Sequence, residues 1–122
     1  MPDFDEVTAI AIEAGAAIME VYDRGDAIDI KTKADDSPLT EADLAANDVI
    51  TTRLLAIDSE IPIISEEGNV GDPTTTPYCW LVDPLDGTKE FIKRNGMFTV
   101  NIALMRRDSD MWKPYFGVVH AP

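Results

Sequence analysis

Apolar residues recur at helical spacing in two separate stretches of the first half of the chain. The first stretch lies between Asp3, a candidate N-cap, and Gly25, and its apolar positions are Phe4, Val7, Ala11, Ala14, Ile18 and Val21. The second follows Thr40, also a candidate N-cap, and its apolar positions are Ala46, Val49, Ile50, Leu54 and Ile57. A three- to four-residue period behind a capping residue predicts an amphipathic helix in each stretch.

After Pro62 the pattern changes to short apolar runs of the kind found in strands. These runs predict strands at residues 61–65, 78–82, 98–105 and 113–119, with a polar loop at 69–77 and a hairpin turn at 106–110. Residues 27–32 predict a short edge strand before a loop at 34–38. Helices followed by strands with hairpin-length links predict an α+β fold, in which two N-terminal helices pack on a largely antiparallel sheet.

Length and composition are those of one folded domain. The chain has 122 residues, of which 45% are apolar, so it is long enough for one core, and we expect residues 1–122 to form a single domain. Cys79 is the one cysteine, which excludes an internal disulfide, and its apolar neighbours predict a buried thiol. The acidic N-terminus and the lack of an apolar run of about 20 residues predict a cytoplasmic protein without signal peptide or membrane span.

Net charge narrows the choice of partners. A formal charge of −13 argues against a nucleic acid polymer or an anionic membrane as a surface partner. A small phosphorylated ligand is compatible with such a chain only when bound cations reverse the local sign of the charge.

Acidic side chains follow two of the predicted strands. The run Trp80–Thr88 sets Asp83 and Asp86 three residues apart at the end of an apolar strand, with Pro84 and Gly87 predicting a rigid turn. The run 61–68 delivers Glu66 in the same way. Three carboxylates and one backbone carbonyl are the hard oxygen donors that Mg²⁺ and Mn²⁺ prefer.

The motif Ile64-Ser65-Glu66-Glu67, the run Trp80–Thr88 and the continuation 89–96 resemble the inositol monophosphatase superfamily. Within it, residues 83–96 followed by 98–104 resemble the bacterial 3′(2′),5′-bisphosphate nucleotidases, and the resemblance extends over essentially the whole chain. It implies a phosphatase that removes the 3′-phosphate of adenosine 3′,5′-bisphosphate to give AMP, in sulfur assimilation or nucleotide recycling.

The resemblance also implies a role for each motif residue. It implies two or three Mg²⁺ ions, replaceable by Mn²⁺ and antagonised by Li⁺, on Glu66, Asp83, Asp86 and the Leu85 carbonyl. Thr88 and Glu66 would orient the attacking water, and Asp43 would assist a further ion and its water. The substrate phosphate would be held by Glu66, Leu85, Asp86, Gly87 and Thr88. Metal ions supply the charge neutralisation and the activated water that phosphate hydrolysis needs, so no histidine base is required.

Two alternative functions stay open. One keeps the chemistry and changes the substrate to inositol phosphate or another sugar phosphate, because no residue of the chain is identified as reading the adenine. The other is a metal-binding structural half: family members carry a second domain whose Trp-Asp aspartate completes the metal site, so we expect residues 1–122 alone to be inactive. A homodimer is compatible with either.

Some of these residues have simpler explanations. Asp43 and Thr88 are also suited to capping a helix, and the second of these helices would run through residues 89–92 with its N–H groups facing the phosphate. Glu67 suits either a supporting role or the surface, Lys93 and Arg94 suit a solvated face, and His120 suits a structural role at a strand end.

Overall fold

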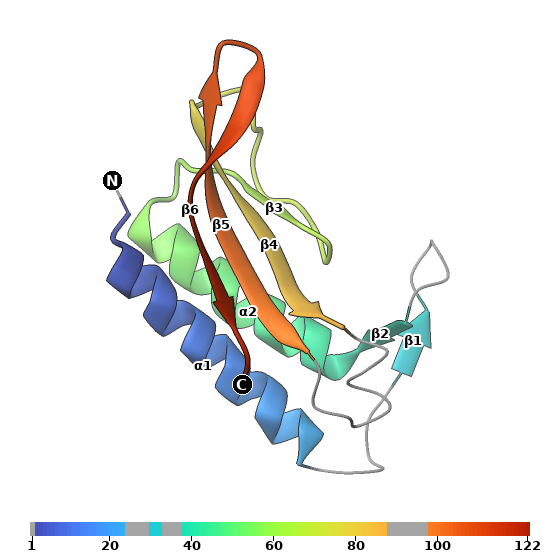
Figure 1. The fold of residues 1–122 in the computed structure, drawn as a ribbon. Helices are drawn as coiled ribbons and strands as arrows, with labels where there is room; N and C mark the ends of the chain where they lie inside the picture. Colours follow the sequence, from blue (N-terminus) through green and yellow to red (C-terminus); the bar gives the residue numbers. More distant parts are fainter. Residues whose placement is uncertain (1, 24–29, 33–37, 88–97) are drawn as a thin grey trace.

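Two long helices cover one face of a four-stranded sheet (Figure 1). The computed structural model describes residues 2–23, 30–32, 38–87 and 98–122. In chain order the elements are α1 (Phe4–Tyr22), β1 (Ile30–Thr32), β2 (Pro38–Thr40), α2 (Glu41–Ile57), β3 (Ile63–Ser65), β4 (Tyr78–Asp86), β5 (Thr99–Asp108) and β6 (Met111–His120). Within the described part, neither helix is long and apolar enough to cross a bilayer.

The first helix forms as the sequence pattern predicts. The Asp3 carboxylate accepts a hydrogen bond from the Asp5 N–H at 3.0 Å, which confirms the N-cap. Five of the predicted apolar positions are buried, namely Val7, Ala11, Ala14, Ile18 and Val21. Phe4 is half exposed, yet its ring meets that of Phe116 edge-on, with centroids 5.6 Å apart. Gly25 lies outside the described residues.

The second helix also begins at the predicted place, directly after Thr40, and buries Ala46, Ile50 and Leu54. The chain before it differs from the prediction. Pro38–Thr40 is a strand, so the loop predicted at 34–38 is contradicted at Pro38. It pairs in an antiparallel ribbon with Ile30–Thr32, which confirms the predicted edge strand for these three residues. Three-residue strands are defined by their pairing, which a local sequence pattern does not reveal. Of the predicted edge strand 27–32, residues 27–29 lie outside the described part, as do residues 33–37.

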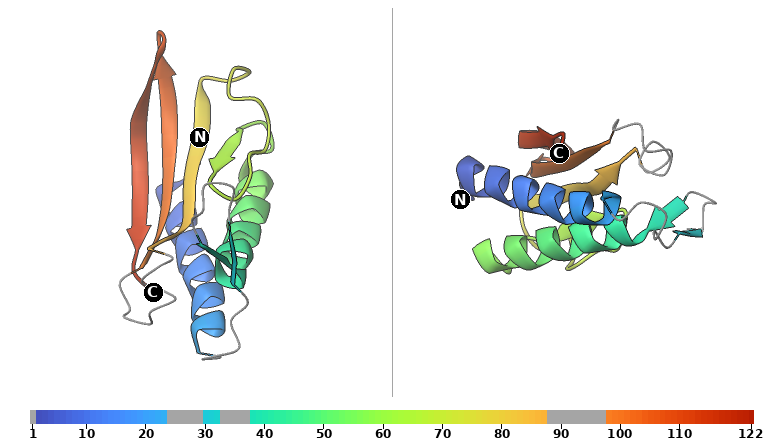
Figure 2. Two further views of the ribbon diagram at one scale, coloured as in Figure 1. Left: turned by 90° about the vertical axis from the view of Figure 1, so that its right-hand side faces the viewer. Right: turned by 90° about the horizontal axis from the view of Figure 1, so that it is seen from below.

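The main sheet has the order β3-β4-β5-β6. β3 and β4 are parallel, whereas the β4–β5 and β5–β6 pairs are antiparallel, so the prediction of a largely antiparallel sheet is confirmed. α2 packs on β4, while α1 packs on β5 and β6. The side chains between the layers form the core, and the central ones from the sheet are Trp80, Val82, Val100, Ile102 and Leu104. Figure 2 shows helices and sheet as two layers, with no described helix on the outer face of the sheet.

Two strand ends differ from the prediction. β4 was expected to end at Val82, but it continues to Asp86, because the pair Asp86–Thr99 resumes the ladder after a register shift that follows Asp83. The predicted turn at 106–110 is narrower: β5 runs to Asp108, and Ser109 has φ 58° in the connection to Met111. This hairpin projects beyond the helices (Figure 1), and within it the Arg107 guanidinium lies 5.6 Å from the ring centre of Trp112.

The thiol of Cys79 is buried, as expected, with 2% of the residue exposed. Burial raises the pKa of this thiol, because the thiolate is poorly stabilised away from water. The group is therefore a packing element of β4 and not a reactive nucleophile.

Candidate functional site

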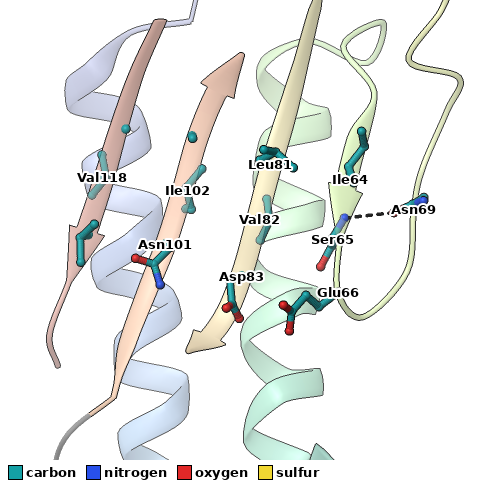
Figure 3. A pocket seen from close by; sticks show the side chains of 13 residues that line it. Ile64, Ser65, Glu66, Asn69, Leu81, Val82, Asp83, Asn101, Ile102 and Val118 are labelled. Carbon is teal, nitrogen blue, oxygen red and sulfur yellow. Dashed lines mark hydrogen bonds between the residues drawn. The ribbon is translucent and has the colours of Figure 1, made fainter. Parts of the chain in front are cut away.

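β3 ends beside the middle of β4. The two strands are parallel neighbours, and Ser65 pairs with Val82, so Glu66 directly follows β3 and Asp83 is the next residue of β4. Figure 3 shows both carboxylates at the same end of the groove described next. Glu66 and Asp83 thus lie at one groove, although Asp83 is inside β4 and not, as was expected, at a strand exit.

A groove of about 690 Å³ lies on the outer face of the sheet, and Glu66 and Asp83 line it. Its floor contains one row of small and apolar residues that crosses all four strands in register: Ile64, Leu81, Ala103 and Gly117. The next row is polar and consists of Glu66, which follows β3, Asp83 of β4 and Asn101 of β5. The groove therefore has an apolar floor and an acidic end, and Leu81 is still 42% exposed within it.

Asn101 is a groove residue that the sequence did not identify as functional. It is the cross-strand partner of Asp83, and its Nδ2 donates to Thr99 Oγ1 at 3.1 Å. The sequence could have indicated it, because Asn101 is a polar residue inside the apolar strand predicted at 98–105 and stands at a position that alternation directs outward. The amide adds an uncharged oxygen and a donor to the acidic end of the groove.

The turn after β3 fixes the chain on both sides of Glu66. Asn69 Oδ1 accepts a hydrogen bond from the Ser65 N–H at 3.1 Å, and the Gly68 N–H donates to the Ser65 carbonyl at 3.2 Å. Gly68 has φ 136°, which a side chain would disfavour. In this turn Glu66 is exposed and Glu67 is half-buried.

The other predicted ligands lie away from the groove lining. Leu85 is buried, Asp86 is exposed beyond the register shift, and Gly87 has φ 94°, in agreement with its predicted special backbone geometry. Asp86 was expected in a turn but is the last residue of β4. Thr88, the predicted helix at 89–92, and Lys93 and Arg94 lie outside the described residues.

Asp43 is 1% exposed and lies in the first turn of α2, beside the buried residues Ala42 and Ala46. A carboxylate there is favoured by the positive end of the helix dipole. Asp43 takes part in polar interactions, and it does not line the groove. Its predicted capping and catalytic roles both stay predictions.

The donor set suits a hard cation. The groove is lined by two carboxylates and by the amide oxygens of Asn69 and Asn101. Its lining contains neither Cys nor His within the described part of the chain, which fits Mg²⁺ or Mn²⁺ better than Zn²⁺. Among residues 2–23, 30–32, 38–87 and 98–122, however, no three Asp, Glu, His or Cys side chains gather into a metal-binding group. The structure brings together one pair of the predicted ligands, and the complete set stays a prediction.

The sequence of this chain matches a known protein family. The sequence pattern of the inositol monophosphatase family matches residues 3–122. The 3′(2′),5′-bisphosphate nucleotidase CysQ of Escherichia coli K12 is 52% identical over 120 residues, which cover 97% of this chain and 47% of that protein. This chain thus spans about half the length of the curated relatives it matches.

Solved structures share the fold of this chain. CysQ from Bacteroides thetaiotaomicron has a TM-score of 0.69 at 41% identity, covering 95% of this chain and 41% of that one. The extragenic suppressor protein suhB from Bartonella henselae has a TM-score of 0.83 at 24% identity, covering 96% of this chain and 44% of its own, and supports the fold alone. The chain belongs to the inositol monophosphatase family.

Proposed function

We propose that this chain carries the cation- and phosphate-binding part of a phosphomonoesterase that removes the 3′-phosphate of adenosine 3′,5′-bisphosphate. The observation that carries the proposal is the meeting of Glu66 and Asp83 at one end of a single groove, in a member of the inositol monophosphatase family. The substrate is proposed from the 52% identity to a 3′(2′),5′-bisphosphate nucleotidase.

Electrostatics makes a cation necessary for this function. A phosphate monoester carries up to two negative charges, and the groove that would receive it ends in two carboxylates on a chain of charge −13. When bound, Mg²⁺ would neutralise phosphoryl oxygens and lower the pKa of a coordinated water. We assign its ligands to Glu66, Asp83, Asp86 and the Leu85 carbonyl, with Mn²⁺ as a substitute and Li⁺ as an inhibitor.

The chain's own residues would then position the reactants. Glu66, exposed at the turn, would hold a water together with Thr88, and would accept its proton. The backbone from Leu85 to Thr88 would bind phosphate oxygens through its N–H groups, for which the positive φ of Gly87 prepares the turn. Asp43, buried on α2, would assist a further cation and its water.

Phosphate release from adenosine 3′,5′-bisphosphate tests the proposal in two proteins. One is this chain alone; the other is a chimaera in which this chain replaces the matching part of the Escherichia coli relative. We expect Mg²⁺-dependent release by the chimaera, abolished by a chelator, and little or none by this chain alone. A folded chimaera that releases no phosphate with Mg²⁺ contradicts the proposal.

Inositol monophosphate serves as the comparison substrate in the same assay. A higher kcat/KM for it than for the nucleotide would replace the proposed substrate and keep the chemistry. The matched control is Asp110→Asn in the chimaera, because Asp110 is exposed on the hairpin at the opposite end of β5 from Asn101. Its activity should equal that of the unchanged chimaera, whereas Asp83→Asn should lose about 100-fold or more.

A further inference from the structure

Glu66 and Asp83 are held in place by different means. Asp83 lies within β4 and pairs with Asn101 of β5, so the β4–β5 ladder positions its backbone. Glu66 follows β3, which is an edge strand of three residues. On its outer side, within the described chain, β3 has one isolated bridge, in which Ile63 and Val70 exchange two hydrogen bonds of 2.8 Å. The position of Glu66 therefore depends on local contacts.

Ser65 supplies most of those contacts. It is 8% exposed, and its hydroxyl is both a donor and an acceptor: Oγ donates to Asn47 Oδ1 at 2.7 Å and accepts from the Glu67 N–H at 3.2 Å. Its backbone N–H donates to Asn69 Oδ1, and its carbonyl accepts from Gly68. Figure 3 shows the Asn69 contact beside Glu66. One buried residue thus fixes the turn that carries the carboxylate.

Asn47 extends this network to the second helix. It lies four residues after Asp43 on α2, so the two side chains occupy the same helical face one turn apart. The Ser65–Asn47 hydrogen bond therefore ties the exit of β3 to the helix that carries Asp43. One short polar contact thus joins the two segments that carry Glu66 and Asp43.

We infer that Ser65 and Asn47 are positioning residues that set Glu66 for cation binding. The inference rests on the proposed function, since it names what orients one of its proposed ligands. Partners that orient metal ligands through hydrogen bonds typically change metal affinity when removed, even though they do not touch the ion. Because Ser65 and Asn47 act through the same hydrogen bond, their effects on affinity are not additive.

Mg²⁺ affinity of this chain, measured by calorimetry, tests the inference without any turnover. Ser65→Ala and Asn47→Ala should each weaken Mg²⁺ binding about 10-fold. The double variant should bind little more weakly than Ser65→Ala alone, and Ser65→Thr, which keeps the hydroxyl, should bind like the unchanged chain. Urea unfolding of each variant shows that it is folded, and Asn47→Ala keeps the test decisive if Ser65→Ala does not fold.

Thr76→Ala is the matched control. Thr76 makes the same kind of contact at the start of β4, where its Oγ1 donates to the Tyr78 carbonyl at 2.6 Å and accepts from the Tyr78 N–H at 3.3 Å. It does not line the groove. This variant should lose stability and keep its Mg²⁺ affinity.

Three results overturn one claim or the other. If the unchanged chain binds Mg²⁺ and folded Ser65→Ala and Asn47→Ala bind it equally well, the inference is wrong and the proposed function stands. If Thr76→Ala loses as much affinity as Ser65→Ala, the effect is one of general stability and the inference is wrong. If the unchanged chain binds no Mg²⁺, the cation site of the proposed function is wrong.

Discussion

Replacing Asp83 with asparagine separates the charge of this residue from its packing. Asparagine has nearly the same shape, so the half-buried position on β4 stays filled and the pairing with Asn101 of β5 is unchanged. The variant removes one of two negative charges that line the same groove. Without Mg²⁺, we expect the free energy of unfolding to stay equal or to rise by up to about 1 kcal/mol, the scale of surface charge pairs.

With Mg²⁺, we expect the unchanged chain to become more stable than Asp83→Asn. A ligand that binds the folded state alone stabilises it by about 2.7 kcal/mol at a free concentration about 100 times its Kd. For a domain of this size about 1 kcal/mol corresponds to about 4 °C, so the unchanged chain should gain about 11 °C in Tm. Asp83→Asn should gain less than about 2 °C at the same Mg²⁺ concentration, because one of the two groove carboxylates is missing.

Thermal unfolding followed by circular dichroism measures both quantities. Ionic strength is held constant with NaCl, since screening alone changes the repulsion between exposed charges. Asp110→Asn, which removes the same charge from the hairpin, should keep the full Mg²⁺-dependent rise in Tm. An Asp83→Asn protein whose Tm rises with Mg²⁺ as much as that of the unchanged chain would refute the assignment of Asp83 as a ligand.

Three further perturbations have defined outcomes. An added Cβ at Gly15 would lie 2.8 Å from His120 Cδ2 and 3.1 Å from Pro122 Cγ, so Gly15→Ala should not stabilise the unchanged chain. In a His120→Ala background it should raise the free energy of unfolding by up to about 1 kcal/mol, and equal effects of Gly15→Ala in the two backgrounds, measured by urea titration, would contradict the His120 contact. Gly87→Ala should cost about 1–2 kcal/mol in the same titrations, because Gly87 has φ 94°, and an unchanged midpoint would show that the strain is absent. Burial raises the pKa of the Cys79 thiol, so the contribution of the protonated thiol to the free energy of unfolding is fully present below the ordinary thiol pKa of about 8.5 and is lost as pH rises through the raised value. Cys79→Ala should lack this loss. Identical pH profiles of the free energy of unfolding for the two chains would disprove it.

The sequence predicted the elements that depend on local periodicity. Both helices follow from the spacing of residues such as Val7, Ile18, Ile50 and Leu54, and the strands follow from short apolar runs. β1 lies inside the strand predicted at 27–32, but β2 and its pairing with β1 were missed. The end of β4 was placed too early, and both errors arise because these features depend on which strand pairs with which. Pairing is a property of the tertiary structure that local propensity does not determine.

The site was predicted to a similar extent. The pair of Glu66 and Asp83 followed from acidic residues at two strand exits, and the structure places both at one groove. The contribution of Asn101 and the hydrogen bond from Ser65 to Asn47 could not be predicted, because they join residues from different elements whose register is unknown before folding. The burial of Asp43 shows that one residue can satisfy the pattern of a helix start and still face the interior.

The central claim is that Glu66, at the exit of β3, and Asp83, on the neighbouring β4, belong to a divalent-cation site, and paramagnetic mapping with Mn²⁺ tests it most directly. In a nitrogen-15 NMR titration of this chain, Mn²⁺ broadens the amide signals of residues close to the bound ion. We predict that the signals of Glu66, Asp83 and Asn101 disappear first, before those of the acidic hairpin residues Asp108 and Asp110. Broadening that begins at the hairpin, or that affects all acidic residues equally, would contradict the account.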